Sequence, residues 1–263
     1  IYRQMQGVKP DFSPFALCRK TANPDIFPCD TVYASGNDTA NNDGFAEKFF
    51  AKLNRVLTGY YNLPGNKTYE YWSECLKKEK CRLIHAHFGE EGIMMAPLAR
   101  KTGIPLVVTL HGYDMSRLLN RRGYISKLRN MFKACSLIIA VSDKFRNDAV
   151  KLGCPPEKIV RHYIGVPVDE FRYTVRQNDP GKELTLLQVS NFVEKKGHKY
   201  TLQALEGALK KGVKDRLIFA RGGALLEENK QLASELGISN HVDFIGKKPM
   251  HEISSLMEKA DIF

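Results

Sequence analysis

The residues at 184–205 have the composition and order of a phosphate-binding segment. A short, mostly apolar run at 184–189 predicts a buried strand, and a periodic apolar pattern after Gly197 predicts a helix. The turn between them places Lys196 beside the free N–H groups of a helix N-terminus, where charge and dipole together would hold a phosphate. The segment has neither a P-loop nor a full GxGxxG, so an ordinary strand-turn-helix with solvated lysines stays open as the alternative.

Polar and glycine-rich clusters follow other predicted strands in the same way. In open parallel sheets, ligands bind beyond the carboxyl ends of the strands. We therefore expect a binding cleft between two domains, formed by the clusters at 85–89, 111–114, Ser142, 191–197, and Gly222 with Gly223. A turn closed by a side-chain cap would explain His111 and Asp114 equally well, and the two glycines could serve only a strand-to-helix turn.

Three histidines fall in these clusters. We expect His85 and His87 to point to opposite faces of one strand, and one of them to be a core histidine with its hydrogen bonds satisfied. No HxxxH, and no HxH accompanied by carboxylates, completes a metal site around His87 and His111. We therefore expect no bound metal.

Alternating strand and helix patterns position these clusters from Arg82 onward. Strands are predicted at 83–87, 106–110, 137–141, 159–163, 184–190, 216–220 and 242–245, and helices near 91–101, 124–134, 144–152, 197–211, 225–236 and 250–258. The alternation predicts an α/β fold of two Rossmann-like, doubly wound parallel-sheet domains. These are expected at 1–167 and 183–263, joined by a linker at 168–182.

The two ends of the chain fit this scheme less completely. Residues 1–43 are predicted to be irregular after a helix tail at 1–6, and helices are predicted at 43–60 and 68–80. Residues 261–263 have the pattern of another strand that is only beginning. We therefore expect a chain truncated at both ends, whose first domain lacks its first strand and whose second is incomplete.

Composition limits the partners. Forty Lys and Arg against 29 Asp and Glu give a net charge of +11, which favours anionic partners. Nucleic acid is not expected, because aromatic side chains do not alternate with the basic ones and no known binding module is present. The six cysteines form no CxxC pair, which favours free thiols and a cytoplasmic location. No apolar run reaches the roughly 18 residues of a membrane span.

The segment 117–133 is basic and amphipathic. It has six basic side chains and no acidic one, namely Arg117, Arg121, Arg122, Lys127, Arg129 and Lys133. Such a segment can lie on an anionic membrane surface, here the inner face of the plasma membrane. A solvated helix whose apolar stripe faces the core is the alternative, and we prefer it.

Six motifs in order carry a resemblance to a known family. The runs HAHFGEEG, PLVVTLHGYD, SLIIAVS, HYIGVPVDEF, VSNFVEKKGHKYTLQAL and VDFIGKKP resemble the retaining family 4 glycosyltransferases of the GT-B fold, particularly bacterial exopolysaccharide and lipopolysaccharide enzymes. The likeness covers 82–263 well and 1–81 only loosely. It implies transfer of a hexose from a nucleotide-sugar to a glycan or lipid-linked acceptor.

The resemblance also implies roles for individual residues. The N-terminal domain would bind the acceptor, and the C-terminal domain would bind the donor, with transfer in the cleft between them. Lys196 would contact the donor diphosphate, and His111 would contact the donor sugar near the reaction centre. The arginine that partners this lysine in the family is Asn191 here, which is a departure, and Arg221 could supply some of the missing charge. Gly197, Gly222 and Gly223 complete the expected donor site, and the acceptor or cleft set is His87, Gly89, Asp114, Ser142 and Gly165.

The implied mechanism needs no cofactor beyond the nucleotide-sugar substrate. Double displacement would want two carboxylates about 5 Å apart, and no such pair is evident, whereas the family is thought to use front-face departure and attack. Lys196 and helix N–H groups would stabilise the leaving diphosphate without a metal. The family's glycine-bearing first strand would precede Ile1, and its donor-binding glutamate pair would follow Phe263. The chain as given is therefore expected to be inactive, and a nucleotide- or sugar-binding protein without activity is the alternative.

Overall fold

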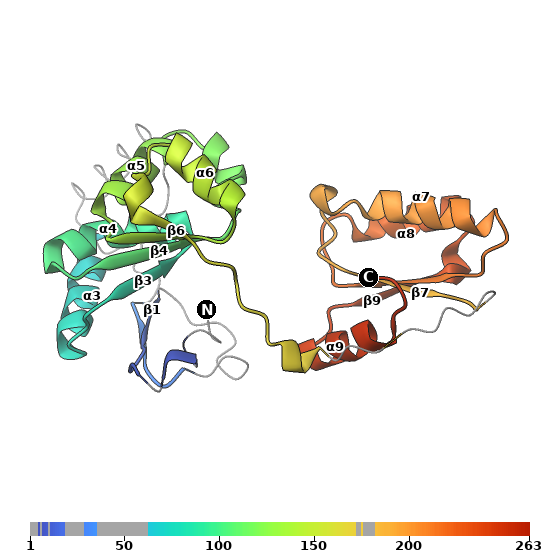
Figure 1. Cartoon of the computed structure of the whole chain (residues 1–263), viewed down its shortest axis with the longest axis horizontal. Helices are drawn as coiled ribbons and strands as arrows, with labels where there is room; N and C mark the ends of the chain where they lie inside the picture. The colour runs from blue at the N-terminus through green and yellow to red at the C-terminus, as the bar shows by residue number, and fades with distance from the viewer. Residues whose placement is uncertain are drawn as a thin grey trace. The chain divides into compact units, whose positions relative to one another are not determined.

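A computed structural model of the chain describes residues 5, 7–9, 11–18, 29–35, 63–171, 175 and 182–263. The chain divides into two compact units, Ile1–Ile164 and Gly165–Phe263, each of which is described by itself (Figure 1). The division falls slightly before the predicted linker at 168–182, most of which lies outside the described residues. The predicted helix at 43–60 and most of the predicted helix tail at 1–6 also lie outside them.

The first unit is built on a four-stranded parallel sheet. Its strands are β3 (Ile84–His87), β4 (Leu106–Leu110), β5 (Leu137–Ala140) and β6 (Ile159–Arg161), in the order β3-β4-β5-β6. Val108, Leu110, Ile138 and Ala140 are fully buried, which accounts for the nearly continuous apolar runs in the sequence. The predicted parallel α/β organisation is confirmed.

The helices of the first unit are α3 (Asn66–Lys78), α4 (Gly89–Thr102), α5 (Tyr124–Ala134) and α6 (Asp143–Lys151), with 3₁₀ turns η1 (Arg117–Asn120) and η2 (Pro156–Lys158). Each crossover from β3 to β6 moves one strand further in the same direction, so right-handed connections place α4, α5 and α6 on one face. In Figure 1, α5 and α6 lie on the same side of this sheet. The core beneath them includes Trp72, Leu98, Leu106, Leu118, Tyr124 and Phe132.

Two short strands near the N-terminus were not expected. β1 (Ala16–Cys18) and β2 (Val32–Ala34) pair in parallel as a separate two-stranded sheet. Phe15 and Leu17 pack against the core of the unit, and the Phe15 ring meets the Tyr33 ring edge-on at 5.9 Å. The prediction that 1–43 is irregular is therefore wrong for these two pieces. Leu17 packs β1 against the core, and β2, in which Val32 and Ala34 are exposed, is joined to it by backbone pairing.

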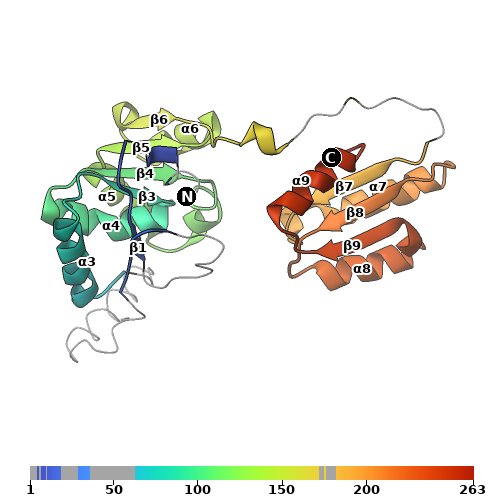
Figure 2. The same ribbon diagram turned by 90° about the horizontal axis from the view of Figure 1, so that it is seen from below.

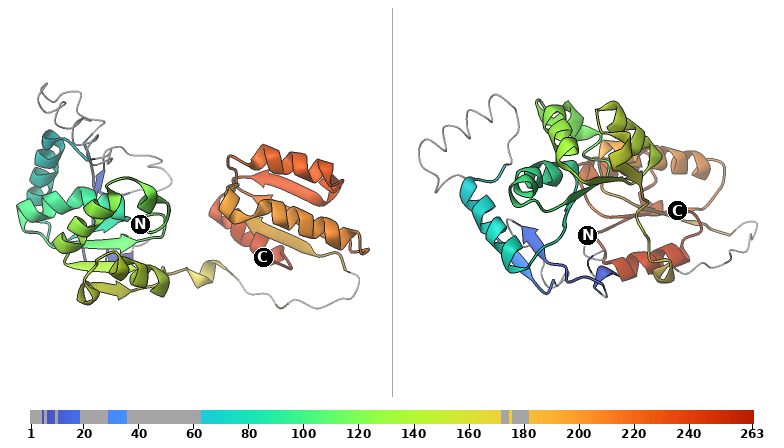
Figure 3. Two further views of the ribbon diagram at one scale, coloured as in Figure 1. Left: turned by 90° about the horizontal axis from the view of Figure 1, so that it is seen from above. Right: turned by 60° about the vertical axis from the view of Figure 1, so that its left-hand side comes forward.

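The second unit has the three-stranded parallel sheet β7 (Thr185–Val189), β8 (Arg216–Ala220) and β9 (Val242–Gly246), in that order. Its helices are α7 (His198–Leu209), α8 (Leu226–Glu235) and α9 (Met250–Lys259), with 3₁₀ turns η3 (Val168–Glu170), η4 (Glu194–Lys196) and η5 (Ser239–His241). The left panel of Figure 3 shows α7 and α8 side by side over one face of the sheet. α9 lies on the other face, nearer the viewer in Figure 2.

The chain after α9 returns to the free edge of β7. Ile262 forms a parallel bridge with Leu186, and the Leu187 N–H donates to the Ile262 carbonyl at 2.9 Å. Residues 261–263 therefore do begin another strand, as predicted. Because this strand lies on the opposite side of β7 from β8, the winding of the sheet reverses at β7. The carboxyl end of β7 is the topological switch point, where open parallel sheets bind ligands.

None of the helices in the described residues is long and apolar enough to cross a membrane. All six cysteines are free, as predicted. Burial raises the pKa of Cys135 to about 12 and that of Cys154 to about 11, so both are protonated, unreactive thiols at neutral pH.

Candidate functional site

The loop that follows β7 is joined by its backbone to the loop that follows β8. The Ser190 N–H donates to the Ala220 carbonyl at 3.2 Å, and the Phe192 N–H donates to the Gly222 carbonyl at 3.1 Å. Gly223 has a φ of 159°, and a Cβ there would lie 2.5 Å from the Phe192 carbonyl oxygen. The missing side chain of Gly223 therefore lets the two loops approach each other closely, and Gly222 joins them through its carbonyl group.

Aromatic rings support the loop that follows β7, which we call the switch-point loop. The Phe192 side chain is fully buried and its ring stacks on the His198 ring at 4.0 Å, with Phe219 at 5.5 Å from Phe192. His198 Nε2 lies 3.0 Å from the Ser190 hydroxyl, which ties the start of α7 to the end of β7. Burial, opposed by the contact with Ser190, lowers the pKa of His198. The sequence reasoning missed this histidine, although it directly follows the predicted Lys196 and Gly197.

Lys196 and Gly197 lie where the phosphate hypothesis requires them. Lys196 ends η4, and Gly197, with a φ of 68°, is the N-cap of α7, so the first N–H groups of that helix lie beside the lysine. Lys196 is exposed and forms no ion pair within the described part of the chain, whereas its neighbour Lys199 is paired with Glu194 at 2.7 Å. The Gln188 amide donates to the Lys196 carbonyl at 3.0 Å and so fixes the backbone of the loop. Asn191 is exposed in the same loop.

In the first unit, three histidine rings stack at the ends of β3 and β4. The centroids of His85 and His87 are 4.3 Å apart, and those of His87 and His111 are 5.3 Å apart. The expectation that His85 and His87 point to opposite faces is wrong, because strand side chains repeat every two residues and positions i and i+2 share a face. His85 Nε2 lies 2.8 Å from the Thr109 hydroxyl.

The histidine stack is held in the neutral form. Burial, followed by the nearby His85 and His111, lowers the pKa of His87 to about 3. Burial also lowers the pKa of His111, while Asp114 opposes that shift. His87 Nδ1 and His111 Nε2 are 3.0 Å apart, so one of these nitrogens carries the shared proton and the other accepts it. In this arrangement Nδ1 is the ring nitrogen through which His111 can meet a ligand.

Asp114 holds the loop that carries His111. Its side chain is fully buried, and its carboxylate accepts N–H groups from His111 at 3.1 Å, Gly112 at 2.7 Å and Gly89 at 2.9 Å. This is the capped turn that was the alternative to a direct site role. The bond to Gly89 also places the carboxylate at the N-terminus of α4, where the helix dipole favours it. A Cβ on Gly89 would lie 2.5 Å from the Tyr124 hydroxyl oxygen, so this position has no room for a side chain.

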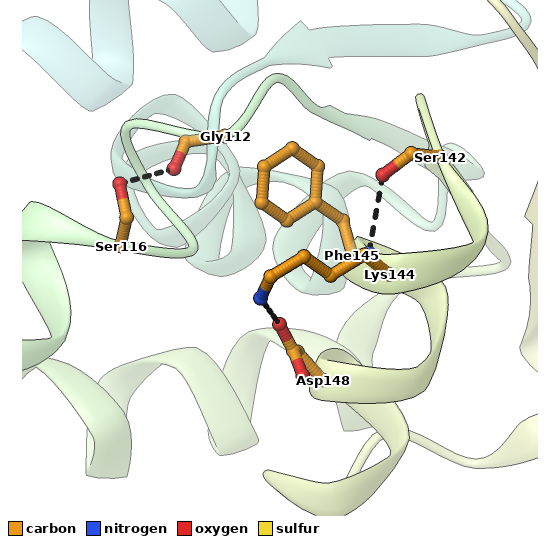
Figure 4. A network of polar contacts seen from close by, with 6 residues as sticks. All are labelled: Gly112, Ser116, Ser142, Lys144, Phe145 and Asp148. Atoms are coloured by element: carbon orange, nitrogen blue, oxygen red, sulfur yellow. Dashed lines mark hydrogen bonds and ion pairs between the residues drawn. The ribbon is translucent and has the colours of Figure 1, made fainter.

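Ser142 supports the same loop through α6. Its hydroxyl caps α6 by accepting the Phe145 N–H at 3.2 Å (Figure 4). The Phe145 ring then packs against Gly112, whose φ is 110° and whose Cβ would lie 2.8 Å from that ring. The Ser116 hydroxyl closes the turn by donating to the Gly112 carbonyl at 2.6 Å. Ser142 is therefore placed to position the His111 loop.

The structure thus brings the predicted residues together in two groups, one in each unit. The first contains His87, Gly89, His111 and Asp114, with Ser142 reaching it through Phe145. The second contains Asn191, Lys196, Gly197, Gly222 and Gly223. Gly165 is exposed at the boundary of the units and none of its described contacts joins it to either group.

The apolar stripe of 117–133 belongs to the protein core. Tyr124, Leu128, Met131 and Phe132 of α5 are buried, as is Leu118 of η1. The alternative interpretation of a solvated helix is therefore confirmed, and the idea that this stripe lies in a membrane surface is wrong. The Arg121 guanidinium pairs with Glu90 at 3.0 Å, while Arg117, Arg122 and Lys133 are exposed.

Two protein-family models match the chain, one after the other. The model described as Glycosyltransferase Family 4 matches residues 32–170, and the one described as Glycosyl transferases group 1 matches residues 170–263. WcaL of Salmonella typhimurium, which is assigned to colanic acid biosynthesis as a glycosyltransferase, is 29% identical over 182 residues, covering 68% of this chain and 44% of WcaL. The amylovoran biosynthesis glycosyltransferase AmsK of Erwinia amylovora is 25% identical over 67% of this chain and 44% of its own length. The chain thus spans less than half the length of these relatives.

Solved structures share the fold at low sequence identity. HepE of Anabaena, crystallised with UDP and glucose, superposes with a TM-score of 0.64 at 15% identity, over 95% of this chain and 73% of HepE. The sucrose-phosphate synthase of Thermosynechococcus elongatus has a TM-score of 0.58 at 17% identity, over 78% of this chain and 57% of its own.

Proposed function

Because the chain belongs to glycosyltransferase family 4, whose model matches more than half of it, we propose that the protein transfers a hexose from a nucleotide-sugar to a glycan or lipid-linked acceptor. Its parallel α/β units have the GT-B fold. Polysaccharide biosynthesis is the setting that WcaL and AmsK suggest. Retention of anomeric configuration is part of the proposal and follows from the family resemblance.

The observation that carries the proposal is the switch point of the second unit. There the exposed ammonium of Lys196 lies beside the start of α7, and no described acid neutralises it. A diphosphate at this place would meet a positive charge and free helix N–H groups together. The UDP bound in the HepE crystals supports a nucleotide as the ligand of such a fold.

We assign His111 to the transferred sugar. The ring is neutral because burial lowers its pKa, and its Nε2 is engaged with His87. A neutral imidazole fixed in this way can form a hydrogen bond to a hydroxyl group through Nδ1 without adding charge to the site. Asp114 and Ser142 then act as positioning residues, since both support the backbone of the loop that carries this ring.

Neutralisation of the leaving diphosphate is assigned to Lys196 and the helix N–H groups, so we propose that turnover needs no metal. Preorganised donors aimed at developing charge can supply such stabilisation, which supports this assignment. A nucleotide-binding protein without turnover is the second candidate, and the exposed Asn191 favours it, because a neutral amide replaces the charge expected there.

A peripheral location at the inner face of the plasma membrane fits a lipid-linked acceptor. With the apolar stripe of 117–133 in the core, any attraction of this segment would come from its exposed basic side chains, among them Arg117, Arg122, Arg129 and Lys133. Exposed basic side chains near an anionic surface contribute about 1 kcal/mol each and are screened by salt.

The test is transfer by the full-length protein, screened with UDP- and GDP-sugars in the presence of EDTA. We expect turnover in wild type, and we expect it to fall sharply in His111→Ala with the fold retained. Lys214 lies exposed at the amino edge of the second sheet, so Lys214→Ala is the matched control and should stay active. Equal turnover by wild type and His111→Ala would refute the role of His111, and turnover only with added metal would refute the mechanism. Nucleotide binding without any turnover would favour the second candidate.

A further inference from the structure

Arg221 adopts a backbone conformation that side chains rarely occupy. Its φ is 100°, and it is the one residue other than glycine with a positive φ in the described part of the second unit. A residue with a Cβ is strained in this region, and glycine is favoured there. The Arg221 N–H donates to the Gly246 carbonyl at 2.6 Å, and this bond helps to hold the strained conformation.

The position of Arg221 is central in the carboxyl edge of the sheet. It directly follows β8, and the next residue, Gly222, accepts the Phe192 N–H of the switch-point loop. Its own N–H reaches Gly246, after which come Lys247 and Lys248. Arg221 is therefore tied to the loops after β7 and β9, the two strands that flank its own.

The charge around Arg221 is available to an anion. The side chain is exposed and forms no ion pair with any described residue. Three of the acidic side chains that follow these strands are paired with lysines, Glu194 with Lys199, Glu227 with Lys230 and Glu252 with Lys248, and Glu228 in the first turn of α8 forms no ion pair with Arg221. A guanidinium in such a place can offer two parallel N–H donors to phosphate oxygens.

From these observations we propose that Arg221 is a second phosphate contact of the donor site. It supplies, from the loop after β8, the positive charge that the neutral Asn191 does not supply from the loop after β7. This inference rests on the proposed function, and it assigns the strained conformation a role. Strained backbone persists at binding sites where the surrounding structure holds it.

The test pairs two substitutions that remove the same guanidinium but differ in backbone strain. In the full-length protein, Arg221→Gly and Arg221→Ala should each weaken UDP and UDP-glucose binding by roughly 10- to 100-fold, as expected for a lost charged hydrogen bond. The affinity of Arg221→Lys should lie between that of these two variants and that of wild type, because lysine keeps the charge but loses the paired donors. Arg221→Gly should melt at a higher temperature than Arg221→Ala, since glycine accepts this φ. Lys214→Ala, which removes one positive charge from the opposite edge, should change affinity by less than about twofold.

The outcomes separate this inference from the proposed function. If UDP affinity were unchanged in both Arg221→Gly and Arg221→Ala but reduced in Lys196→Ala, the inference would be overturned and the proposed function would stand. Absence of any nucleotide binding by wild type would overturn both. A higher melting temperature for Arg221→Ala than for Arg221→Gly would contradict the strain argument and count against the inference. If the Arg221 variants lost as much affinity for uridine, which has no phosphate, as for UDP, Arg221 would contact the nucleoside and the inference would be overturned.

Discussion

Acidification should destabilise the first unit through His87. The pKa of this side chain is about 3 in the folded chain and about 6.5 when unfolded, and the cause is burial together with His85 and His111. Below pH 6.5 the unfolded chain therefore binds a proton that the folded chain refuses, so stability is fully present above this pH and is lost as the pH falls.

The size of the loss can be worked from these values. Between pH 7 and pH 5 the folded side chain stays neutral, because its pKa lies well below 5, so the loss is set by the titration of the unfolded chain. Linkage then gives a contribution of about 2 kcal/mol from His87 over this interval. Since the His87 side chain is only 8% exposed, water screens little of this effect.

The protein carries its own probe for the measurement. Trp72 is the single tryptophan of the chain and is fully buried in the first unit, so its fluorescence during urea denaturation reports the unfolding of that unit. Wild type and His87→Gln should be compared at pH 7 and pH 5, and the variant should lose about 2 kcal/mol less on acidification.

A matched control is the exposed His162, which follows β6 in the same unit. His162→Gln should lose as much stability as wild type, because its side chain meets water in the folded and the unfolded chain alike. Equal losses in wild type and His87→Gln would refute the reasoning, since they would mean that the folded unit accepts the proton on His87.

Two further substitutions test the second unit. Gly223→Ala should destabilise the fold by more than about 2 kcal/mol, because its Cβ would lie 2.5 Å from the Phe192 carbonyl oxygen. Gly222→Ala is the control, because a Cβ there meets nothing within 4 Å, and both variants are compared in thermal melts followed by circular dichroism. Equal melting temperatures of the two variants would contradict the close approach of the loops. Lys196→Ala should weaken nucleotide-sugar binding by about 1 to 3 kcal/mol in calorimetry, with Lys214→Ala close to wild type, and unchanged affinity would show that the phosphate is held elsewhere.

The elements with strong periodic patterns could be predicted closely. β4, α5 and β8 have the predicted bounds, because their apolar residues are buried and the sequence pattern reflects that burial directly. The placement of Lys196 before α7 also followed from the sequence, since a strand, a polar turn and a helix are local features. β1 and β2 were missed because three residues give no period to recognise.

The parts of the site that were missed depend on contacts between distant residues. Sequence spacing cannot show that the Asp114 carboxylate accepts the N–H of Gly89, or that Phe145 fills the space beside Gly112. The stacked histidines were misassigned by a wrong use of the strand period, which the sequence itself could have corrected. The strain at Arg221 has no sequence signal at all, because a φ value is a property of the folded backbone.

The bridge between Ile262 and Leu186 has a consequence for the order in which the second unit is made. During synthesis β7, β8 and β9 leave the ribosome in their order in the sheet, so they can pair as they emerge. One edge of β7 must then wait for residues that follow α9, and Asp261 is the first to engage it, through the Thr185 N–H at 2.9 Å. Until that contact forms, β7 presents unpaired backbone groups, and such an edge can recruit a strand from another chain. Nascent or shortened chains that end before Asp261 would accordingly be prone to self-association.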